Sequence, residues 1–141
     1  MTVSWPGVIA KGTTCHVPVT SMDFFPTFVH AAGGSTEQIP ELEGRDLKPV
    51  FTGQTLDRES LFWHYPHNRP DVKYFMGSVI LQGPWKYYQG HGTIKDALFN
   101  LADDPLEKHN LINNKPEQVK AMQSRLESWL NEVGAKMPPK N

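Results

Sequence analysis

The chain has 141 residues, of which 38% are hydrophobic and 21% charged, and its formal net charge is −1. This length is enough for a domain with its own core, and the balanced charge predicts neither a nucleic-acid partner nor a membrane partner. No apolar run approaches the roughly 18 residues of a membrane span, and no basic segment followed by an apolar run marks a signal peptide. The single cysteine, Cys15, excludes an internal disulfide and any multi-cysteine zinc site.

The first third of the chain predicts a strand end followed by two helices. Residues 2–5 alternate weakly in polarity, which predicts the end of a strand. Thr20 or Ser21 is a suitable N-cap for the first helix, and Gly33 supplies the left-handed residue that commonly ends one. A polar loop follows, and residues 46–51 predict a second, short helix.

The middle of the chain predicts a small sheet. Four aromatic or β-branched stretches are separated by turn-forming residues, and we expect strands over residues 61–65, 74–82, 85–89 and 96–101. Gly83 and Pro84 form the tightest of these connections. Short strands at this spacing are typical of an antiparallel meander.

The last helix has the strongest pattern in the chain. Pro116 suits the first helical position, and Gly134 suits the end. Between them, apolar side chains recur every three or four residues and form one face: Val119, Met122, Leu126, Trp129, Leu130 and Val133. The order of elements predicts an α+β fold, with a small antiparallel sheet of about four strands packed against this C-terminal helix.

Five stretches, in order along the chain, carry a resemblance to a known family: Trp5-Pro-Gly7, residues 19–33 (Val-Thr-Ser-Met-Asp-Phe-Phe-Pro-Thr-Phe-Val-His-Ala-Ala-Gly), 42–53, 61–67 (Leu-Phe-Trp-His-Tyr-Pro-His) and 98–111. Together they resemble the C-terminal region of the sulfatases, of the arylsulfatase or N-acetylgalactosamine-6-sulfatase type. The resemblance implies that residues 1–57 are a remnant of the end of the family's larger α/β domain, with a strand-helix segment, and that residues 58–141 are its C-terminal subdomain.

The catalytic chemistry of the family is not expected in this chain. The resemblance implies a formylglycine nucleophile, made from the first residue of Cys/Ser-x-Pro/Ala-x-Arg, and a calcium ion held by carboxylate and amide oxygens. Cys15 is followed by His-Val-Pro-Val and Ser4 by Trp-Pro-Gly-Val, so neither has the arginine. The calcium ligands of the family lie upstream of the region that this chain resembles. We therefore expect no catalytic residue, metal site or cofactor here, and we interpret Asp103-Asp104 as a turn.

Three residues are candidates for substrate contact in an intact enzyme. The resemblance places His64, His67 and Arg69 near the entrance of the substrate cleft, against the sugar or aryl part of the substrate. The alternative is ordinary packing of the aromatic segment, with His67 in a loop. A zinc site at the two histidines lacks an evident third ligand. The other histidines, His16, His30, His91 and His109, show no partner pattern.

Two functions from different classes stay open. The first is the C-terminal part of a sulfuric ester hydrolase, which completes the fold and shapes the substrate cleft. The second is a free-standing, non-catalytic binding or interaction module. Because residues 2–5 and the first helix would lack their neighbours, we expect either a homo-oligomer, with Phe24, Phe25 and Phe28 at the contact, or a missing N-terminal sulfatase domain as partner. The sulfated substrate and the compartment are not predicted, nor whether Met1 is a true start or a fragment boundary.

Overall fold

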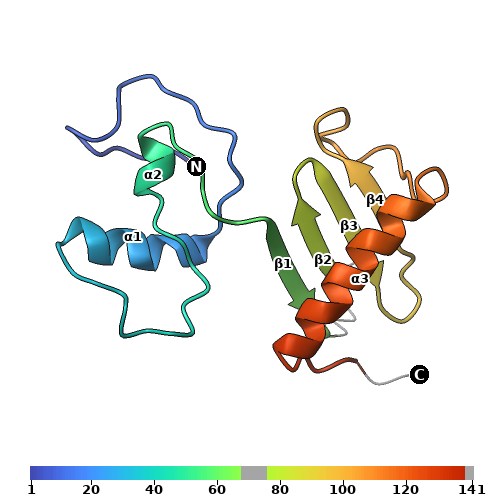
Figure 1. The fold of residues 1–141 in the computed structure, drawn as a ribbon. Helices are drawn as coiled ribbons and strands as arrows, with labels where there is room; N and C mark the ends of the chain where they lie inside the picture. Colours follow the sequence, from blue (N-terminus) through green and yellow to red (C-terminus); the bar gives the residue numbers. More distant parts are fainter. Residues whose placement is uncertain (68–75, 139–141) are drawn as a thin grey trace. The chain divides into compact units, whose positions relative to one another are not determined.

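The computed structural model describes residues 1–67 and 76–138 (Figure 1). The chain divides into two compact units, Met1–Arg58 and Glu59–Asn141. The interpretation of residues 1–57 as the end of a larger α/β domain stays a prediction. Arg69 and the first two residues of the strand predicted over 74–82 lie outside the described residues.

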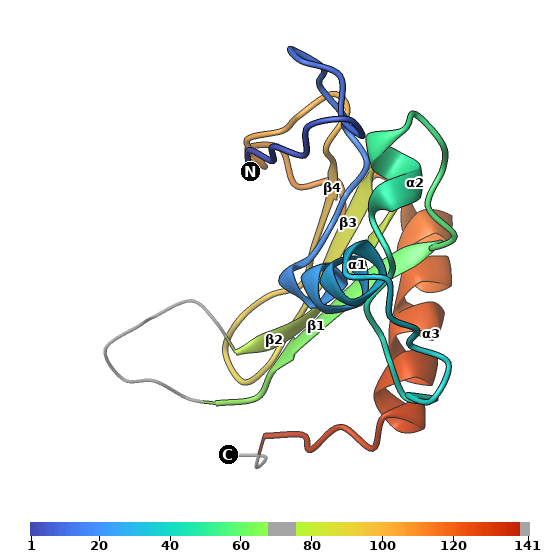
Figure 2. The ribbon, with the colours of Figure 1, turned by 90° about the vertical axis from the view of Figure 1, so that its left-hand side faces the viewer.

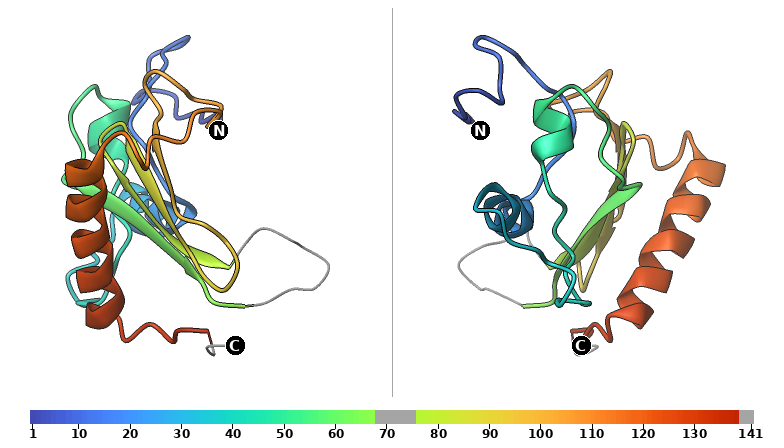
Figure 3. Two further views of the ribbon diagram at one scale, coloured as in Figure 1. Left: turned by 90° about the vertical axis from the view of Figure 1, so that its right-hand side faces the viewer. Right: turned by 60° about the vertical axis from the view of Figure 1, so that its left-hand side comes forward.

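The second unit is an antiparallel sheet with one long helix. The strands are β1 (Ser60–Tyr65), β2 (Gly77–Gln82), β3 (Trp85–Gly90) and β4 (Ala97–Asn100), paired in the order β1-β2-β3-β4. Helix α3 (Pro116–Glu132) lies across one face of this sheet, as Figure 3 shows. The predicted α+β fold, with about four antiparallel strands against a C-terminal helix, is confirmed.

Strand register decides which side chains form the core of this unit. Ile80 pairs with Phe62 on one side and with Tyr87 on the other, and Tyr87 pairs with Leu98. Directly paired residues point to the same face of a sheet, so this row faces α3. The core contains Ile80, Tyr87, Leu98, Met122, Leu126 and Leu130, and Phe62 stacks on Trp129 with ring centroids 4.8 Å apart. Val133, predicted on the same helix face, is 46% exposed because α3 ends at Glu132.

The first unit contains only short helices. These are the 3₁₀ turn η1 (Ser21–Asp23), α1 (Phe24–Ala31) and α2 (Lys48–Phe51). η1 runs directly into α1, and a long irregular segment joins α1 to α2, as Figure 2 shows. The strand predicted over residues 2–5 is wrong: this segment is described and has no strand partner. A strand exists only where a neighbour accepts and donates its ladder hydrogen bonds. Here Val8 N and Ile9 N instead donate to Trp5 O, at 3.0 and 2.9 Å, in a turn.

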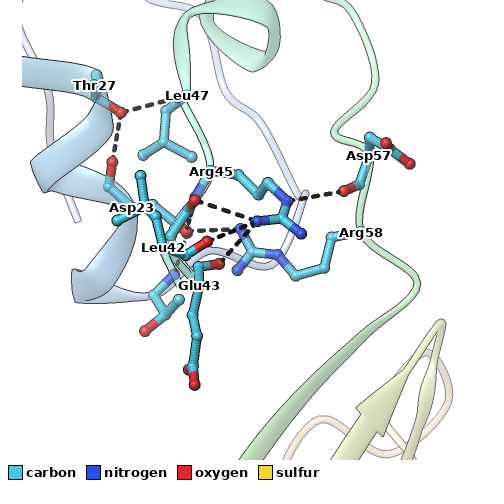
Figure 4. Close-up of polar contacts among 10 residues, drawn as sticks. Asp23, Thr27, Leu42, Glu43, Arg45, Leu47, Asp57 and Arg58 are labelled. Atoms are coloured by element: carbon cyan, nitrogen blue, oxygen red, sulfur yellow. Dashed lines mark hydrogen bonds and ion pairs between the residues drawn. The ribbon is translucent and has the colours of Figure 1, made fainter. Parts of the chain in front are cut away.

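A buried carboxylate organises this unit (Figure 4). Asp23 has no exposed surface, and its two oxygens accept three hydrogen bonds. Thr20 N donates to Oδ2 at 2.8 Å, while Arg45 N and Arg58 Nη2 donate to Oδ1 at 2.9 and 2.8 Å. A buried charge is tolerated when it is paired and hydrogen-bonded in this way. Asp23 therefore holds the start of α1 to the chain on both sides of α2.

Thr27, one turn along α1, extends the same arrangement. Its hydroxyl donates to Asp23 O at 2.6 Å and accepts from Leu47 N at 2.9 Å, as Figure 4 shows. Gly44 passes so close to the chain that a Cβ there would overlap Met22 O. Together these contacts fix the segment before α2 against η1 and α1. All the partners belong to the first unit, and this polar group has a structural role.

Candidate functional site

The candidate site lies in the second unit, around the end of β1. His64 occupies the same face of β1 as Phe62, two residues earlier, and it pairs in register with Ser78 of β2. Its Nδ1 is 2.9 Å from Ser78 Oγ, and its Nε2 is 3.0 Å from Lys136 O, in the segment after α3. Both ring nitrogens are thus bonded within the unit, which supports the packing interpretation of His64.

A second histidine completes this group. His91 follows β3 and is 7% exposed, with its Nε2 3.1 Å from Ser78 Oγ. The rings of His91 and His64 lie 5.8 Å apart at 74°. Burial lowers the pKa of His91, nearby His64 lowers it further, and Asp96 acts in the opposite direction. Sequence analysis missed His91, because only the register set by the hairpin turn at Gly83, which pairs Ser78 with Gln89, brings the His91 ring within reach of Ser78.

His67 occupies a different environment from His64. It lies just beyond β1, is exposed, and packs its ring edge-to-face against Tyr65, with ring centroids 5.4 Å apart at 81°. The structure therefore separates the predicted pair: His64 is bonded inside the unit, and His67 is accessible from solvent. Whether either of them contacts a substrate stays a prediction, as it does for Arg69.

Residues 1–136 match the family model described as "N-sulphoglucosamine sulphohydrolase, C-terminal". The chain belongs to the sulfatase family. This confirms the resemblance, and it confirms that the chain corresponds to the C-terminal region of sulfatase-like proteins. Steryl-sulfatase of Rattus norvegicus is 32% identical over 134 residues, which cover 77% of this chain and 23% of that protein.

A second relative and a solved structure match similar shares of the chain. Arylsulfatase A of Bos taurus is 28% identical over 137 residues, covering 80% of this chain and 26% of that protein. The solved structure of Ps i-CgsB in complex with k-i-k-neocarrahexaose has a TM-score of 0.69 at 24% identity, and the match covers 89% of this chain and 27% of that one. The chain thus spans about a quarter of the length of these relatives.

The described residues contain neither the nucleophile sequence of the sulfatases nor a group of side chains that could hold a metal ion. Neither Cys15 nor Ser4 begins a Cys/Ser-x-Pro/Ala-x-Arg sequence, and the Cys15 thiol is exposed on an irregular segment. Within residues 1–67 and 76–138, no three His, Cys, Asp or Glu side chains are grouped to hold a metal ion. No helix in that part of the chain is long and apolar enough to span a membrane.

Proposed function

We propose that this chain serves as the C-terminal part of a sulfuric ester hydrolase, completing the fold and forming part of the substrate cleft of an intact enzyme. The observation that carries the proposal is the match of residues 1–136 to a C-terminal sulfatase region, over about a quarter of each relative's length. The formylglycine nucleophile and the calcium ion of such an enzyme would come from residues outside this chain.

Within the cleft, His67 is the residue proposed to contact substrate. Its imidazole is exposed at the end of an edge strand and its ring packs against Tyr65, which limits its orientations. An imidazole donates a hydrogen bond when neutral and adds a positive charge when protonated, and both suit a sulfated substrate. Arg69, two residues on, would add a permanent positive charge. His64 would contribute by holding the end of β1 in place.

The test transfers this segment into an active relative. Residues 61–72 replace the equivalent segment of rat steryl-sulfatase, and His67→Ala is made in this chimera. The proposal predicts that His67→Ala raises KM and leaves kcat and the melting temperature unchanged. In this chain itself, His64→Ala should lower the melting temperature, since it leaves the Lys136 carbonyl without a partner and Ser78 bonded only to His91. Unchanged kinetics in the His67 variant would show that His67 is a surface residue that does not contact the substrate.

One observation favours the binding-module alternative. Trp63 and Tyr65 lie on the same face of edge strand β1 and are 44% and 38% exposed. Two exposed aromatic rings on one face can stack against sugar rings or a protein surface. Calorimetric titration with a sulfated oligosaccharide, carried out on the chain and on its Trp63→Ala variant, distinguishes the alternatives. Binding that is lost in the variant would favour the module.

A further inference from the structure

Three polar side chains of the first unit form a line that the proposed function does not use. His30 Nδ1 is 2.9 Å from Asp46 Oδ2, and His30 Nε2 is 3.2 Å from Thr36 Oγ1. His30 lies in the last turn of α1, Thr36 in the segment after that helix, and Asp46 two residues before α2. A carboxylate, an imidazole and a hydroxyl in this order are the arrangement in which an imidazole activates a hydroxyl as a nucleophile.

The Asp46 carboxylate fixes the hydrogen positions of this line. Its Oδ1 accepts from Lys48 N at 2.9 Å, and its Oδ2 faces His30. A carboxylate can only accept, so His30 carries its hydrogen on Nδ1. In the neutral imidazole Nε2 is then an acceptor, and the Thr36 hydroxyl donates to it. The hydroxyl hydrogen of Thr36 therefore points at a base.

Two turns hold Thr36 beside the end of α1. Gly33 has the left-handed φ of 78° that commonly ends a helix, and its N–H donates to His30 O at 3.0 Å. Further along, Ile39 N donates to Thr36 O at 3.0 Å. The backbone before and after the hydroxyl is thus hydrogen-bonded, which limits the positions that the hydroxyl can take relative to the imidazole.

The surroundings of Thr36 fit an uncharged substrate. The side chains of His30 and Asp46 are 35% and 23% exposed, so a molecule in solution can reach the line. Residues 35–43 contain three glutamates and neither lysine nor arginine, and their charge adds to that of Asp46. This negative charge repels phosphate and sulfate esters. Ile39, 40% exposed in the same turn as Thr36, offers apolar surface to an aryl or acyl group.

We propose that Thr36 is a nucleophile that accepts the acyl group of an activated, uncharged ester, with His30 as its general base. As Thr36 Oγ1 bonds to the carbonyl carbon, its proton moves to His30 Nε2, and the aryl oxide leaves with the electron pair of the broken C–O bond. The imidazolium then gives its proton to the aryl oxide, so the products are acyl-Thr36 and a phenol. Asp46 is a positioning residue, which keeps the hydrogen of neutral His30 on Nδ1. The reaction uses the first unit alone and does not depend on the sulfatase function.

Acetyl transfer from 4-nitrophenyl acetate tests the proposal. The chain is incubated with the ester and digested, and the acetyl groups are located by peptide mass spectrometry. Thr13 is the reference in the same sample, because its exposed hydroxyl donates to Ala10 O and not to an imidazole. General-base assistance typically contributes about 10²–10⁴-fold, so we expect acetylation of Thr36 about 100-fold or more faster than that of Thr13. Acetylation of Thr36 no faster than that of Thr13 would overturn the proposal.

Two variants separate the base from the positioning residue. His30→Gln removes the base, and acetylation of Thr36 should fall to the level of an ordinary threonine. In Asp46→Asn the amide oxygen serves Lys48 N, so the amide NH₂ faces His30 and moves its hydrogen to Nε2, which can no longer accept the Thr36 proton. This variant should also lose most of the acetylation, and ¹⁵N NMR should show the change of tautomer, which a merely structural role of Asp46 would not cause.

His16→Gln is the matched control, since His16 is an exposed histidine of the same unit. It should leave the acetylation of Thr36 unchanged. Acetylation that persists in His30→Gln would overturn the proposal, and so would an Nε2–H tautomer of His30 in the chain without substitutions. If His30→Gln does not fold, the comparison of Thr36 with Thr13 in the chain without substitutions decides.

Discussion

The Asp23 carboxylate and the Arg58 guanidinium lie 2.8 Å apart, although 35 residues of sequence separate them. Neither group is well exposed: the Asp23 side chain has no exposed surface, and that of Arg58 is 11% exposed. Removing one partner of a buried ion pair leaves the other charge without compensation, which costs more than the pair contributes. The first unit should therefore be sensitive to the loss of either partner.

We predict that Asp23→Ala destabilises the first unit by about 3–5 kcal/mol. The change removes the acceptor of three hydrogen bonds, from Thr20 N, Arg45 N and Arg58 Nη2. Hydrogen exchange of the α1 amides measures the stability of this unit separately from the other. Asp57→Ala is the control, because Asp57 is exposed and contributes its backbone carbonyl, to Arg45 Nε. Equal exchange in the two variants would contradict the structural role of Asp23.

The second unit depends on the contact between α3 and the sheet. We predict that Trp129→Ala lowers the unfolding free energy by about 3 kcal/mol, the low end for an aromatic truncation, because Trp129 is only partly buried where it stacks on Phe62. Chemical denaturation measures the effect. Trp63→Ala, at a side chain that is 44% exposed, should cost much less. A change near zero for Trp129 would mean that α3 does not pack on this row of side chains.

Stability should fall in two steps as the pH decreases. The pKa of His91 is lowered in the fold, chiefly by burial, so its contribution is present above its ordinary value of 6.5 and is lost as the pH falls below it. The pKa of Asp104 is lowered by a hydrogen bond from His109 N, so its contribution is lost only as the pH falls below 3.8. Melting temperatures measured against pH should lose the upper step in His91→Leu and the lower step in Asp104→Asn. Retention of the upper step in His91→Leu would contradict the assignment.

Much of the second unit could be predicted from local signals. Turn residues such as Gly83 separate the strands, and the spacing of Met122, Leu126 and Leu130 marks the buried face of α3. Both signals involve only residues that are close together in the sequence. Residues 2–5 have the alternating polarity of a strand but no neighbouring strand. The alternation alone cannot show whether such a neighbour exists. His91 was missed for a related reason, since its contact with Ser78 depends on the register between strands.

We propose that the isolated chain associates with copies of itself through α1. Phe25 and Phe28 are 50% and 67% exposed, Met22 beside them is 45% exposed, and Phe24 stacks on Phe28 with ring centroids 5.9 Å apart. Exposed apolar faces of this kind favour association, and a two-fold dimer is the commonest closed form.

We predict that light scattering at micromolar concentration shows more than a monomer. The double variant Phe25→Ser with Phe28→Ser should reduce the species to a monomer. Leu106→Ser, at a residue that is 70% exposed in the second unit, should leave it unchanged. If the chain without substitutions were monomeric, self-association would be refuted, and an N-terminal sulfatase domain would be the remaining candidate partner.

Hydrolysis of an aryl sulfate by the purified chain, with calcium present, tests the central claim most directly. Neither Cys15 nor Ser4 lies in the sequence from which the sulfatase nucleophile is made, and the chain spans about a quarter of its relatives. We predict a rate equal to that of buffer and of a heat-denatured sample. Turnover that persists through purification and increases in proportion to the protein concentration would contradict the account, because it would require a catalytic centre within these 141 residues.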